Sequence, residues 1–291
     1  MRHALVFGAT GQIGFPLLGL LQGAGWRVTA LSRAEQSDEP GLEWLRGELP
    51  TAQGLPTRVD TIFSCGPLDG FASWYARSTI DCARVIAFGS TSVEVKRGSA
   101  DAEERDVARR LREGEETVFA TTAKRGATAT LLRPTLIYGA GRDATLTRIA
   151  QLASRWGRFP LPRDAKGLRQ PVHADDLAAA AFACAGTPAT QGQTYALPGG
   201  ETLTYRDMVA RVLACLTPPP TLIELPSPMF NAALFLAQLT GRATGLGEAA
   251  VRRMRSDLTF DIDPARRDFG YAPRASPPRR QISPPAGGGQ G

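Results

Sequence analysis

The feature that most constrains this chain is a glycine-rich loop that follows its first apolar segment. Ala4–Phe7 has the composition of a short buried strand and runs into GATGQIG, where Gly8, Gly11 and Gly14 recur at every third position. A leucine-rich helical pattern comes next. Glycines between a strand and a helix let the backbone turn tightly and approach a pyrophosphate at the helix N-terminus. A purely structural turn is the alternative for the glycines alone, but their context predicts a dinucleotide-binding loop.

The apolar segments of the first half of the chain show no alternation with polar residues. Strands of this kind are buried on both faces, which is typical of a parallel sheet. Besides the first strand, the pattern predicts strands at 26–31 (WRVTAL), Leu42–Leu45, Thr61–Ser64, Val85–Phe88 and Thr128–Leu132, and helices at Tyr75–Cys82 and Asp101–Arg125. This alternation of strands and helices predicts an α/β fold with a Rossmann-type doubly wound parallel sheet.

The end of the second strand indicates which dinucleotide the loop favours. An acidic residue at this place would accept hydrogen bonds from an adenosine ribose, but this chain has Ser32 followed by Arg33. The planar guanidinium of Arg33 suits a 2′-phosphate. We therefore expect NADP(H) as the cofactor, with NAD(H) less favoured. An ordinary exposed arginine is the alternative for Arg33.

A cluster of hydroxyl side chains ends a later apolar run. The segment VIAF at 85–88 leads through Gly89 into Ser90, Thr91 and Ser92. An oxidoreductase often keeps its chemistry where a buried strand ends in such a cluster. The cluster is therefore a candidate active-site segment.

The chain resembles an extended or atypical short-chain dehydrogenase/reductase of the NAD-dependent epimerase/dehydratase type over roughly Ala4–Arg274. The motifs that carry this resemblance are, in chain order, GATGQIG at 8–14, RGEL at 46–49, FGSTS at 88–92, LLRPTLIYGAGRD at 131–143, RQPVHADDLA at 169–178 and RRDFGYAPR at 266–274. Several separate motifs in the right order are more specific than one glycine loop. The relatives that are nearest in pattern act on nucleoside-diphosphate sugars.

The resemblance implies a second, smaller and discontinuous C-terminal domain that binds the substrate. It divides the chain into an NADP(H)-binding Rossmann domain (1–139 and 169–193) and a small substrate domain (140–168 and 194–274). The Pro- and Gly-rich segment 275–291 has the composition of a disordered tail. Asp175 and Asp176 are expected to open a helix that returns to the core, and His173 to be a hinge residue and not a general base.

The resemblance also implies roles for individual residues. Thr91 or Ser92 would fix the substrate oxygen, so these two are the candidate catalytic residues. Arg169 stands where related enzymes direct a basic side chain to the substrate diphosphate, with a surface arginine as the alternative. Tyr138 is expected to pack beside the cofactor and completes the candidate substrate site. The predicted cofactor-binding residues, which include the RGEL turn beside the adenine, are Gly8, Thr10, Gly11, Gln12, Ile13, Gly14, Ser32, Arg33, Glu48, Leu49, Cys65 and Gly66.

The proton-transfer pair of the family is missing from this sequence. The family uses a Tyr whose pKa is lowered by a Lys four residues later on the same helix, and none of the five tyrosines here has a lysine at that spacing. Val107 and Leu111 stand at the two places when the helix is aligned on REGEETVF. Glu94, Lys96 and Arg97 could supply an acid or a base, although a solvated loop of mixed charge is the commoner explanation.

Composition argues against several other classes of function. The net charge of +6 comes from arginines spread along the chain, without the basic block of a nucleic-acid-binding groove. The four cysteines form no CxxC and do not pair with the two histidines, so no metal site is expected. No signal-peptide pattern precedes the glycine loop, and we expect a cytoplasmic protein. Met229–Leu239 is too short to span a bilayer, so a core or interfacial helix is expected and peripheral membrane contact is less favoured.

Two hypotheses from different classes of function follow. The first is an NADP(H)-dependent oxidoreductase or epimerase that acts on a nucleotide sugar or a similar polar carbonyl or alcohol compound through non-standard catalytic residues. The second is a catalytically degenerate NADP(H)-binding sensor or assembly subunit, since the glycine loop is present and the Tyr–Lys pair is not. The motifs of the substrate domain favour the enzyme. A homodimer is compatible with both, because many relatives dimerise.

Overall fold

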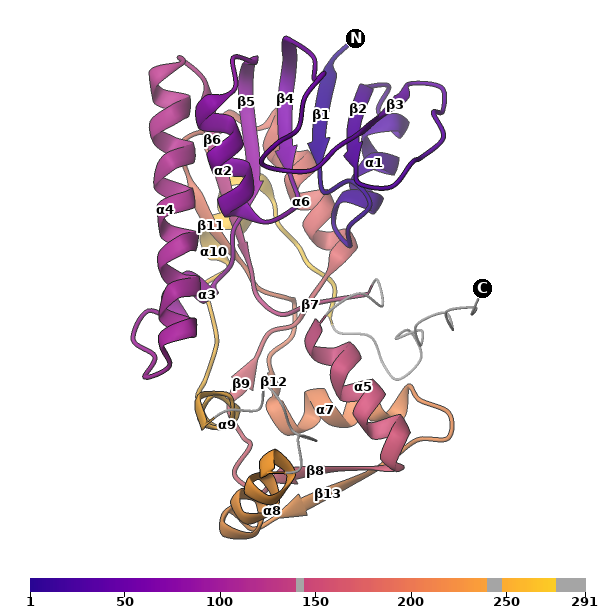
Figure 1. Cartoon of the computed structure of the whole chain (residues 1–291), viewed down its shortest axis with the longest axis vertical. Coiled ribbons are helices and arrows are strands. Elements are labelled where there is room, and N and C mark those ends of the chain that lie inside the picture. Colours follow the sequence, from indigo (N-terminus) through magenta and orange to yellow (C-terminus); the bar gives the residue numbers. More distant parts are fainter. Residues whose placement is uncertain (140–143, 240–247, 276–291) are drawn as a thin grey trace. The chain divides into compact units, whose positions relative to one another are not determined.

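A computed structural model describes residues 1–139, 144–239 and 248–275 of the chain (Figure 1). Contacts between residues divide them into two compact units. Unit 1 consists of Met1–Thr135, Val172–Pro198 and Asp261–Pro273, and unit 2 of the described residues of 136–171, 199–260 and 274–275. The predicted tail, 275–291, lies outside the described residues apart from Ala275.

Unit 1 is built on a seven-stranded parallel sheet in the order β11-β6-β5-β4-β1-β2-β3. Its strands are β1 (His3–Phe7), β2 (Arg27–Ser32), β3 (Leu42–Arg46), β4 (Arg58–Ser64), β5 (Asp81–Phe88), β6 (Thr128–Pro134) and β11 (Thr194–Leu197). The chain first builds outward from β1 to β3 and then returns to place β4 on the other side of β1. This reversal is the topological switch point where open α/β sheets bind their ligands. The predicted doubly wound parallel sheet is confirmed.

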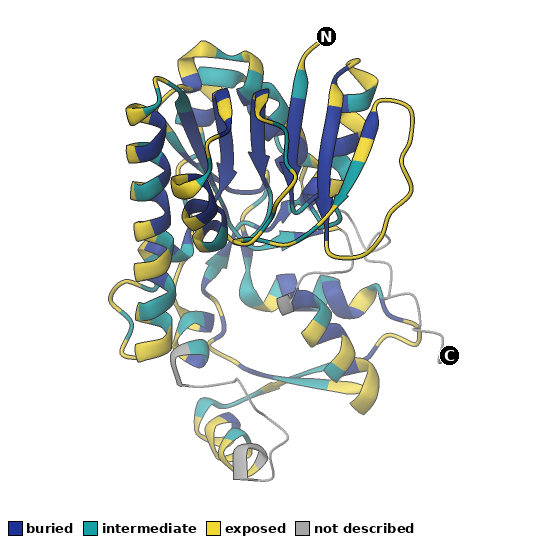
Figure 2. Cartoon of the chain, turned by 45° about the horizontal axis from the view of Figure 1, so that its top comes forward, coloured by how far each residue is buried: buried dark blue, intermediate teal, exposed yellow. Residues whose placement is uncertain are grey.

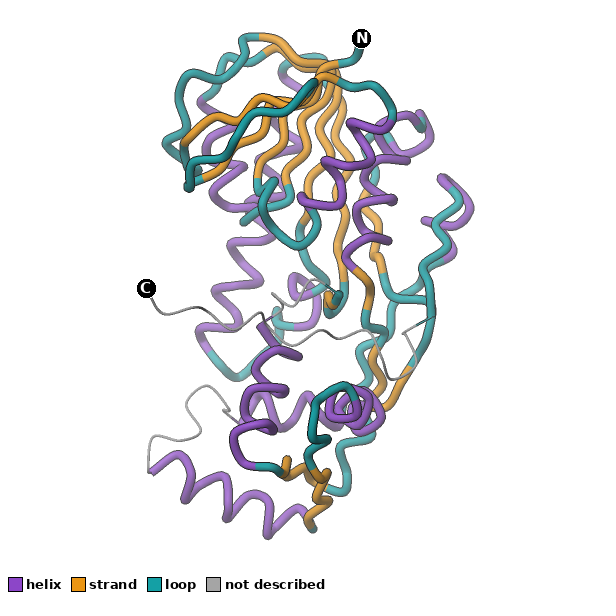
Figure 3. Tube along the Cα trace, turned by 90° about the vertical axis from the view of Figure 1, so that its right-hand side faces the viewer, coloured by secondary structure: helices purple, strands orange, loops and turns teal. Residues whose placement is uncertain are grey.

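Helices cover both faces of this sheet, with α1 and α6 packed together on one face and α2 and α4 on the other (Figure 1). The helical segments of unit 1 are α1 (Gly14–Gly23), α2 (Leu68–Arg77), α3 (Ser92–Val95), α4 (Ala102–Lys124), α6 (Ala174–Gly186), a 3-10 turn (Pro188–Thr190) and α10 (Asp263–Phe269), and the short β10 (Val172–His173) precedes α6. The strands between the helix layers are mostly buried, apart from the edge strand β3 (Figure 2), and run side by side (Figure 3). This double burial explains why their sequences lack polar alternation.

The prediction of a helix at Tyr75–Cys82 is wrong. The helix there is α2, which ends at Arg77 because Ser78 adopts an extended backbone. Cys82 already belongs to β5, where it is buried. The inward face of α2 carries aromatic rings, and the centroid of Trp74 lies 4.6 Å from that of Phe7. The apolar stripe of the helix thus lies earlier in the chain than predicted, and the strand begins four residues earlier.

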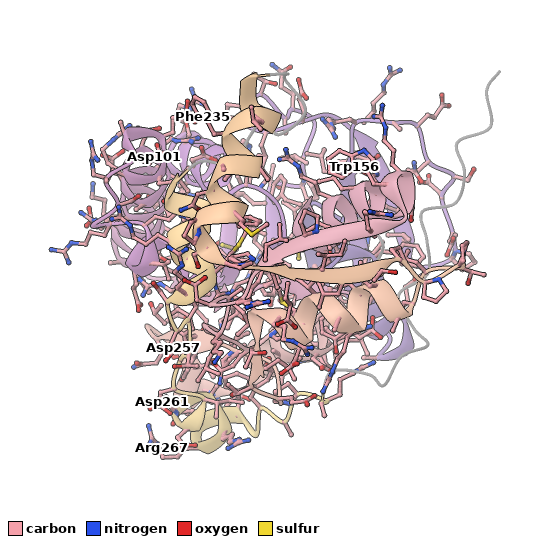
Figure 4. The ribbon with its side chains drawn as sticks, turned by 90° about the horizontal axis from the view of Figure 1, so that it is seen from below. Asp101, Trp156, Phe235, Asp257, Asp261 and Arg267 are labelled. Carbon is pink, nitrogen blue, oxygen red and sulfur yellow. The ribbon has the colours of Figure 1, made fainter. Side chains whose placement is uncertain are left out.

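The helix predicted at Asp101–Arg125 is confirmed as α4. Asp101, labelled in Figure 4, caps its N-terminus by accepting hydrogen bonds from Glu103 N at 2.8 Å and Glu104 N at 3.4 Å. Two acidic side chains in the first turn also suit the helix dipole. These contacts fix where α4 begins.

Two segments assigned by sequence to the small domain lie in unit 1. The strand β11 pairs in parallel with β6, and Tyr195 on β11 donates a hydrogen bond to Asp268 on α10 at 2.6 Å. A four-residue strand at the sheet edge has too little pattern to reveal its partner, so this pairing could not be predicted. Conversely, residues 136–139 and 169–171, which the sequence assigned to the Rossmann domain, lie in unit 2. The roles of the two units in binding cofactor and substrate stay predictions.

Unit 2 combines short strand pairs with helices around its own apolar core. Its elements are β7 (Ile137–Tyr138), α5 (Ala144–Trp156), β8 (Arg158–Pro162), β9 (Leu168–Arg169), β12 (Leu203–Thr204), α7 (Tyr205–Ala214), β13 (Thr221–Leu225), α8 (Ser227–Leu239) and α9 (Glu248–Arg255). β13 pairs in parallel with β8, and β12 pairs antiparallel with β9. The predicted core or interfacial helix is α8, where Phe235 (Figure 4) is 60% exposed. None of the helices that the structure describes is long and apolar enough to cross a membrane.

Candidate functional site: the β1–α1 loop and the neighbouring strand ends

The loop between β1 and α1 lies so close to neighbouring backbone that side chains do not fit. Gly8 has φ +71°, and a Cβ there would lie 2.8 Å from the carbonyl carbon of Cys65 and from Gly66 N. At Gly14, a Cβ would lie 2.7 Å from the Cα of Ala9. Both positions therefore require glycine. The backbone at Gly8 and Gly14 is therefore not covered by side chains of its own, and it lies beside the switch point between β1 and β4.

Backbone donors of this loop remain available for a ligand. Gly11 N donates to Gly8 O at 2.9 Å. In the described part of the chain, by contrast, nothing accepts a hydrogen bond from the N–H of Gln12, Ile13 or Gly14, and no side chain caps α1. The Oε1 atom of Gln12 is buried and also lacks a partner there. Free N–H groups at the positive end of a helix form an arrangement that binds phosphate.

The end of β4 borders this loop. Cys65 N donates to Phe7 O at 2.9 Å, which continues the β1–β4 ladder by one residue. The Cα of Gly8 is 3.9 Å from where a Cβ on Gly66 would lie. Burial raises the pKa of the Cys65 thiol to about 12. The structure thus brings the predicted residues Cys65 and Gly66 beside the glycine loop, with a thiol that stays neutral at physiological pH.

The ends of β2 and β3 lie next to each other. Ser32 is buried, whereas Arg33 directly after it is exposed and has no ion-pair or side-chain hydrogen-bond partner among the described residues. On the neighbouring segment, Glu48 is exposed and Leu49 packs against the apolar cluster of the α2 face. The residues predicted to contact adenosine therefore share one corner of the sheet.

The hydroxyl cluster after β5 divides into one buried and two accessible side chains. Thr91 is 7% exposed and donates its hydroxyl proton to Pro134 O at 3.1 Å. Ser90 and Ser92 are half-buried, and the Oγ of Ser90 accepts a hydrogen bond from Ser92 N at 3.1 Å. Neither serine hydroxyl has an acceptor among the described residues. Ser90 was not among the residues predicted from the sequence, but it is as available to a ligand as Ser92. Its place in the same hydroxyl cluster could have identified it as a candidate.

A partly buried ion-pair network packs against the start of this cluster. Arg133, at the end of β6, donates to Glu115 on α4 at 2.8 Å and to Glu94 on α3 at 2.7 Å. Hydrogen bonding to Glu115 is the main reason that the pKa of Arg133 is raised. A Cβ on Gly89 would lie 2.9 Å from Glu115 Oε1. Glu94, considered above as an acid or base, is thus one arm of an ion-pair network.

The two residues that the resemblance places at the positions of the Tyr–Lys pair lie on α4 and are apolar. Val107 and Leu111 are half-buried, and Leu111 packs against the apolar cluster under α2. Neither side chain can transfer a proton. Lys96 is half-buried and Arg97 is exposed in the loop after α3.

The tyrosines of unit 1 are fixed by structural contacts. The hydroxyl of Tyr75 lies against a buried thiol, that of Tyr195 donates to Asp268, and that of Tyr271 donates to Pro198 O at 3.0 Å. Burial raises the pKa of all three phenols. A tyrosine that acts as a base needs the opposite shift.

Arg169 has an internal role in unit 2. It is 7% exposed, and its guanidinium donates to Leu168 O at 2.6 Å, to Ser256 O at 2.8 Å and to Arg253 O. It also lies 5.3 Å over the ring of Tyr205. Burial lowers its pKa. These contacts tie β9 to the end of α9, so the guanidinium predicted to face a diphosphate is engaged by carbonyls of its own unit.

The remaining predicted residues also have packing or capping roles. Tyr138 is 4% exposed in the apolar core of unit 2. His173 caps α6 by accepting a hydrogen bond from Asp175 N at 3.1 Å, and Asp175 and Asp176 lie in the first turn of that helix. Among the described residues, no group of three or more His, Cys, Asp or Glu side chains could hold a metal ion.

Comparison with known proteins adds partial matches of sequence. No family model matches the chain. A 2-alkyl-3-oxoalkanoate reductase of Stenotrophomonas maltophilia is 31% identical over 158 residues, which cover 50% of this chain and 47% of the relative. A UDP-glucose 4-epimerase of Vibrio cholerae is 27% identical over 143 residues, covering 49% and 41%. The chain therefore spans less than half the length of these two relatives. A second 2-alkyl-3-oxoalkanoate reductase, from Shewanella oneidensis, is 23% identical and covers 94% of this chain and 82% of the relative.

Solved structures share the fold over nearly the whole chain. MoeE5, in complex with UDP-glucuronic acid and NAD, is 19% identical with a TM-score of 0.67 and covers 94% of both chains. A UDP-glucose 4-epimerase of Thermotoga maritima with UDP-glucose is 12% identical with a TM-score of 0.68 and the same coverage. The terminal R domain from the myxalamid biosynthetic pathway is 20% identical with a TM-score of 0.71, covering 95% and 87%. At these identities the likeness establishes the fold.

Proposed function

We propose that this chain binds NADP(H) and is an oxidoreductase of the reductase or epimerase type. The observation that carries the proposal is the geometry of the glycine-rich loop of Gly8–Gly14. A Cβ would collide with backbone at Gly8 and at Gly14, and three consecutive N–H groups there have no acceptor among the described residues. A pyrophosphate is the group that such a loop fits.

The residues present fit a nicotinamide dinucleotide along one edge of the sheet. Gln12, Ile13 and Gly14 would donate to the pyrophosphate, and the free guanidinium of Arg33 would pair with a 2′-phosphate. No acidic side chain stands at Ser32 to hold an unphosphorylated ribose. The neutral thiol of Cys65 adds no negative charge beside the loop. NADP(H) is therefore the proposed cofactor.

A bound nicotinamide would supply or accept a hydride. The chain's own contribution to that chemistry would be to orient the substrate oxygen through the hydroxyl cluster. Ser92 keeps a hydroxyl proton that it can donate, whereas the proton of Thr91 already goes to Pro134 O. Since the tyrosines of unit 1 have raised pKa values, we propose water or another non-tyrosine group as the proton carrier.

The proposed substrate is a carbonyl or alcohol compound. The partial relatives are named for 3-oxoalkanoates and for UDP-glucose, which belong to this broad class. To test this, calorimetry first compares NADPH with NADH on the intact chain, and the absorbance of NADPH is then followed with 2-alkyl-3-oxoalkanoates and with keto-sugar nucleotides. Tight NADPH binding with consumption by either class supports the proposal, and the absence of binding to a folded chain refutes it.

A second candidate function is a cofactor-binding subunit or sensor without turnover. The observation that favours it is the pair of apolar side chains, Val107 and Leu111, at the places of the proton-transfer residues. Under this alternative NADPH binds as tightly, but no substrate class oxidises it. The same two experiments therefore separate the two candidates.

A further inference from the structure

The arginines at the two ends of the β2–β3 ladder differ in whether they form an ion pair. At the amino end, Arg27 pairs with Glu43 across the strands at 3.3 Å. At the carboxyl end, Arg33 and Arg46 are both exposed, and neither has an ion-pair or side-chain hydrogen-bond partner among the described residues. One ladder thus carries a neutralised end and an end with two unneutralised positive charges.

The register of the ladder places the second arginine beside the first. Ser32, the residue before Arg33, is the Cα partner of Arg46. Neighbouring strands lie about 4.8 Å apart, so the backbone of Arg46 lies directly across from the end of β2. Gly47 N donates to Ser32 O at 2.9 Å, which extends the pairing one residue beyond Arg46 and fixes this corner.

The acidic side chains of the intervening segment do not neutralise this corner. Asp38 accepts a hydrogen bond from Trp44 N at 2.7 Å, and Glu39 accepts one from Gln22 at 3.3 Å. Glu35 and Glu48 are exposed and form no ion pair with a described residue. Two arginines at one corner of the sheet without an ion-paired carboxylate leave a local excess of positive charge, which a bound dianion would neutralise.

We infer that Arg33 and Arg46 form a two-strand clamp for the 2′-phosphate of the cofactor, so that Arg46 is a second residue that determines NADP(H) specificity. This inference rests on the proposed function, because it needs the dinucleotide to lie along the edge that starts at the glycine loop. Each planar guanidinium can offer two parallel donors to a phosphate. Arg33 reaches the phosphate from the end of β2 and Arg46 from the end of β3.

The test compares three single variants of the intact chain, Arg46→Ala, Arg33→Ala and the matched control Arg27→Ala. All three remove one exposed arginine from the same ladder. Calorimetry measures the dissociation constants of NADPH and NADH for each, and thermal melting checks that each variant is folded. Arg46→Ala should weaken NADPH about tenfold and leave NADH nearly unchanged, because a charge-assisted hydrogen bond to phosphate is lost. Arg27→Ala should leave both constants as in the wild type.

The outcomes separate the inference from the function it rests on. If Arg33→Ala weakens NADPH selectively and Arg46→Ala behaves like Arg27→Ala, the clamp is overturned while cofactor binding stands. An equal loss of NADPH and NADH in Arg46→Ala also overturns it, since the residue would then act on a part common to both. If the folded wild type binds neither dinucleotide, the proposed function itself fails.

Discussion

The two sides of the sheet edge in unit 1 differ in how many of their polar groups the fold itself uses. On the β1–β2 side, the N–H groups of 12–14 and the guanidinium of Arg33 have no partner among the described residues. On the β5–β6 side, Thr91 bonds to Pro134 O, and Arg133 bonds to Glu115 and Glu94. The first side is prepared for a ligand, and much of the second is satisfied internally. Under the proposed function, binding a dinucleotide and moving a proton would therefore depend on different parts of the sheet edge.

The largest expected effect comes from closing the glycine loop. In Gly14→Ala the new methyl would lie 2.7 Å from the Cα of Ala9, so the loop must move away from the shape that we propose binds phosphate. NADPH affinity should fall by about a hundredfold or more. Gly19→Ala is the matched control on the same helix, where a Cβ meets nothing within 4 Å. Equal NADPH affinities of the two variants, measured by calorimetry, would contradict the claim that the β1–β2 side of the sheet edge binds the dinucleotide.

The next effect concerns stability on the other side. Glu115→Gln leaves Arg133 without its buried carboxylate partner and should lower the free energy of unfolding by about 2 kcal/mol. Glu113→Gln, which breaks an exposed pair with Arg109 on the same helix, should change stability little. Urea unfolding measures both variants. NADPH affinity should be retained by folded Glu115→Gln, and its loss would show that the two sides are coupled.

The hydroxyl cluster should divide into a structural and a functional part. Thr91→Val removes a buried hydrogen bond and should cost about 1 kcal/mol of unfolding free energy. Ser92→Ala should leave the melting temperature unchanged and lower the turnover number with the substrate found in the absorbance screen. The reverse pattern, a destabilised Ser92→Ala and an unaffected Thr91→Val, would contradict the assignment.

The smallest effect is a pH dependence at the loop. Burial raises the pKa of Cys65 to about 12, so this thiol stays neutral in the fold and ionises more readily in the unfolded chain. Its contribution to stability is therefore complete below about pH 9 and is lost as the pH rises towards 12. Cys65→Ala should shift the midpoint of alkaline unfolding, followed by circular dichroism, upward by about 0.3 pH units. Cys215→Ala, in unit 2, is the control. An identical response of the two variants would argue against a thiol at 65 that the fold keeps neutral.

The strands of the central sheet were predictable where burial on both faces shaped their sequences. Uniformly apolar strands alternating with helical segments predicted most of the sheet of unit 1, because burial on both faces shapes the sequence of each strand. The end of α2 was misplaced, since Tyr75 and Cys82 are both apolar in character although one lies in a helix and the other in a strand. The edge strand β11 was also missed, because pairing with β6 across more than 60 residues leaves no local pattern.

The candidate site was predictable only where backbone geometry demands a residue type. The glycines at 8 and 14 are required by close approach, so their spacing was informative. Arg169 had the right residue type, but its contacts with Ser256 O and Arg253 O depend on a strand and a helix far apart in the sequence. Arg46 opens the RGEL motif, but that motif implied no role for it, and only the β2–β3 register places it across from Ser32, the residue before Arg33.

The most direct test of the account is the dissociation constant of NADPH for the intact wild-type chain, measured by calorimetry beside that of NADH. The account predicts one site per chain that favours NADPH by about tenfold or more, because the loop donors serve both dinucleotides and the arginines at the ends of β2 and β3 serve only the phosphorylated one. A folded chain that binds neither dinucleotide, or that binds NADH more tightly, would contradict it.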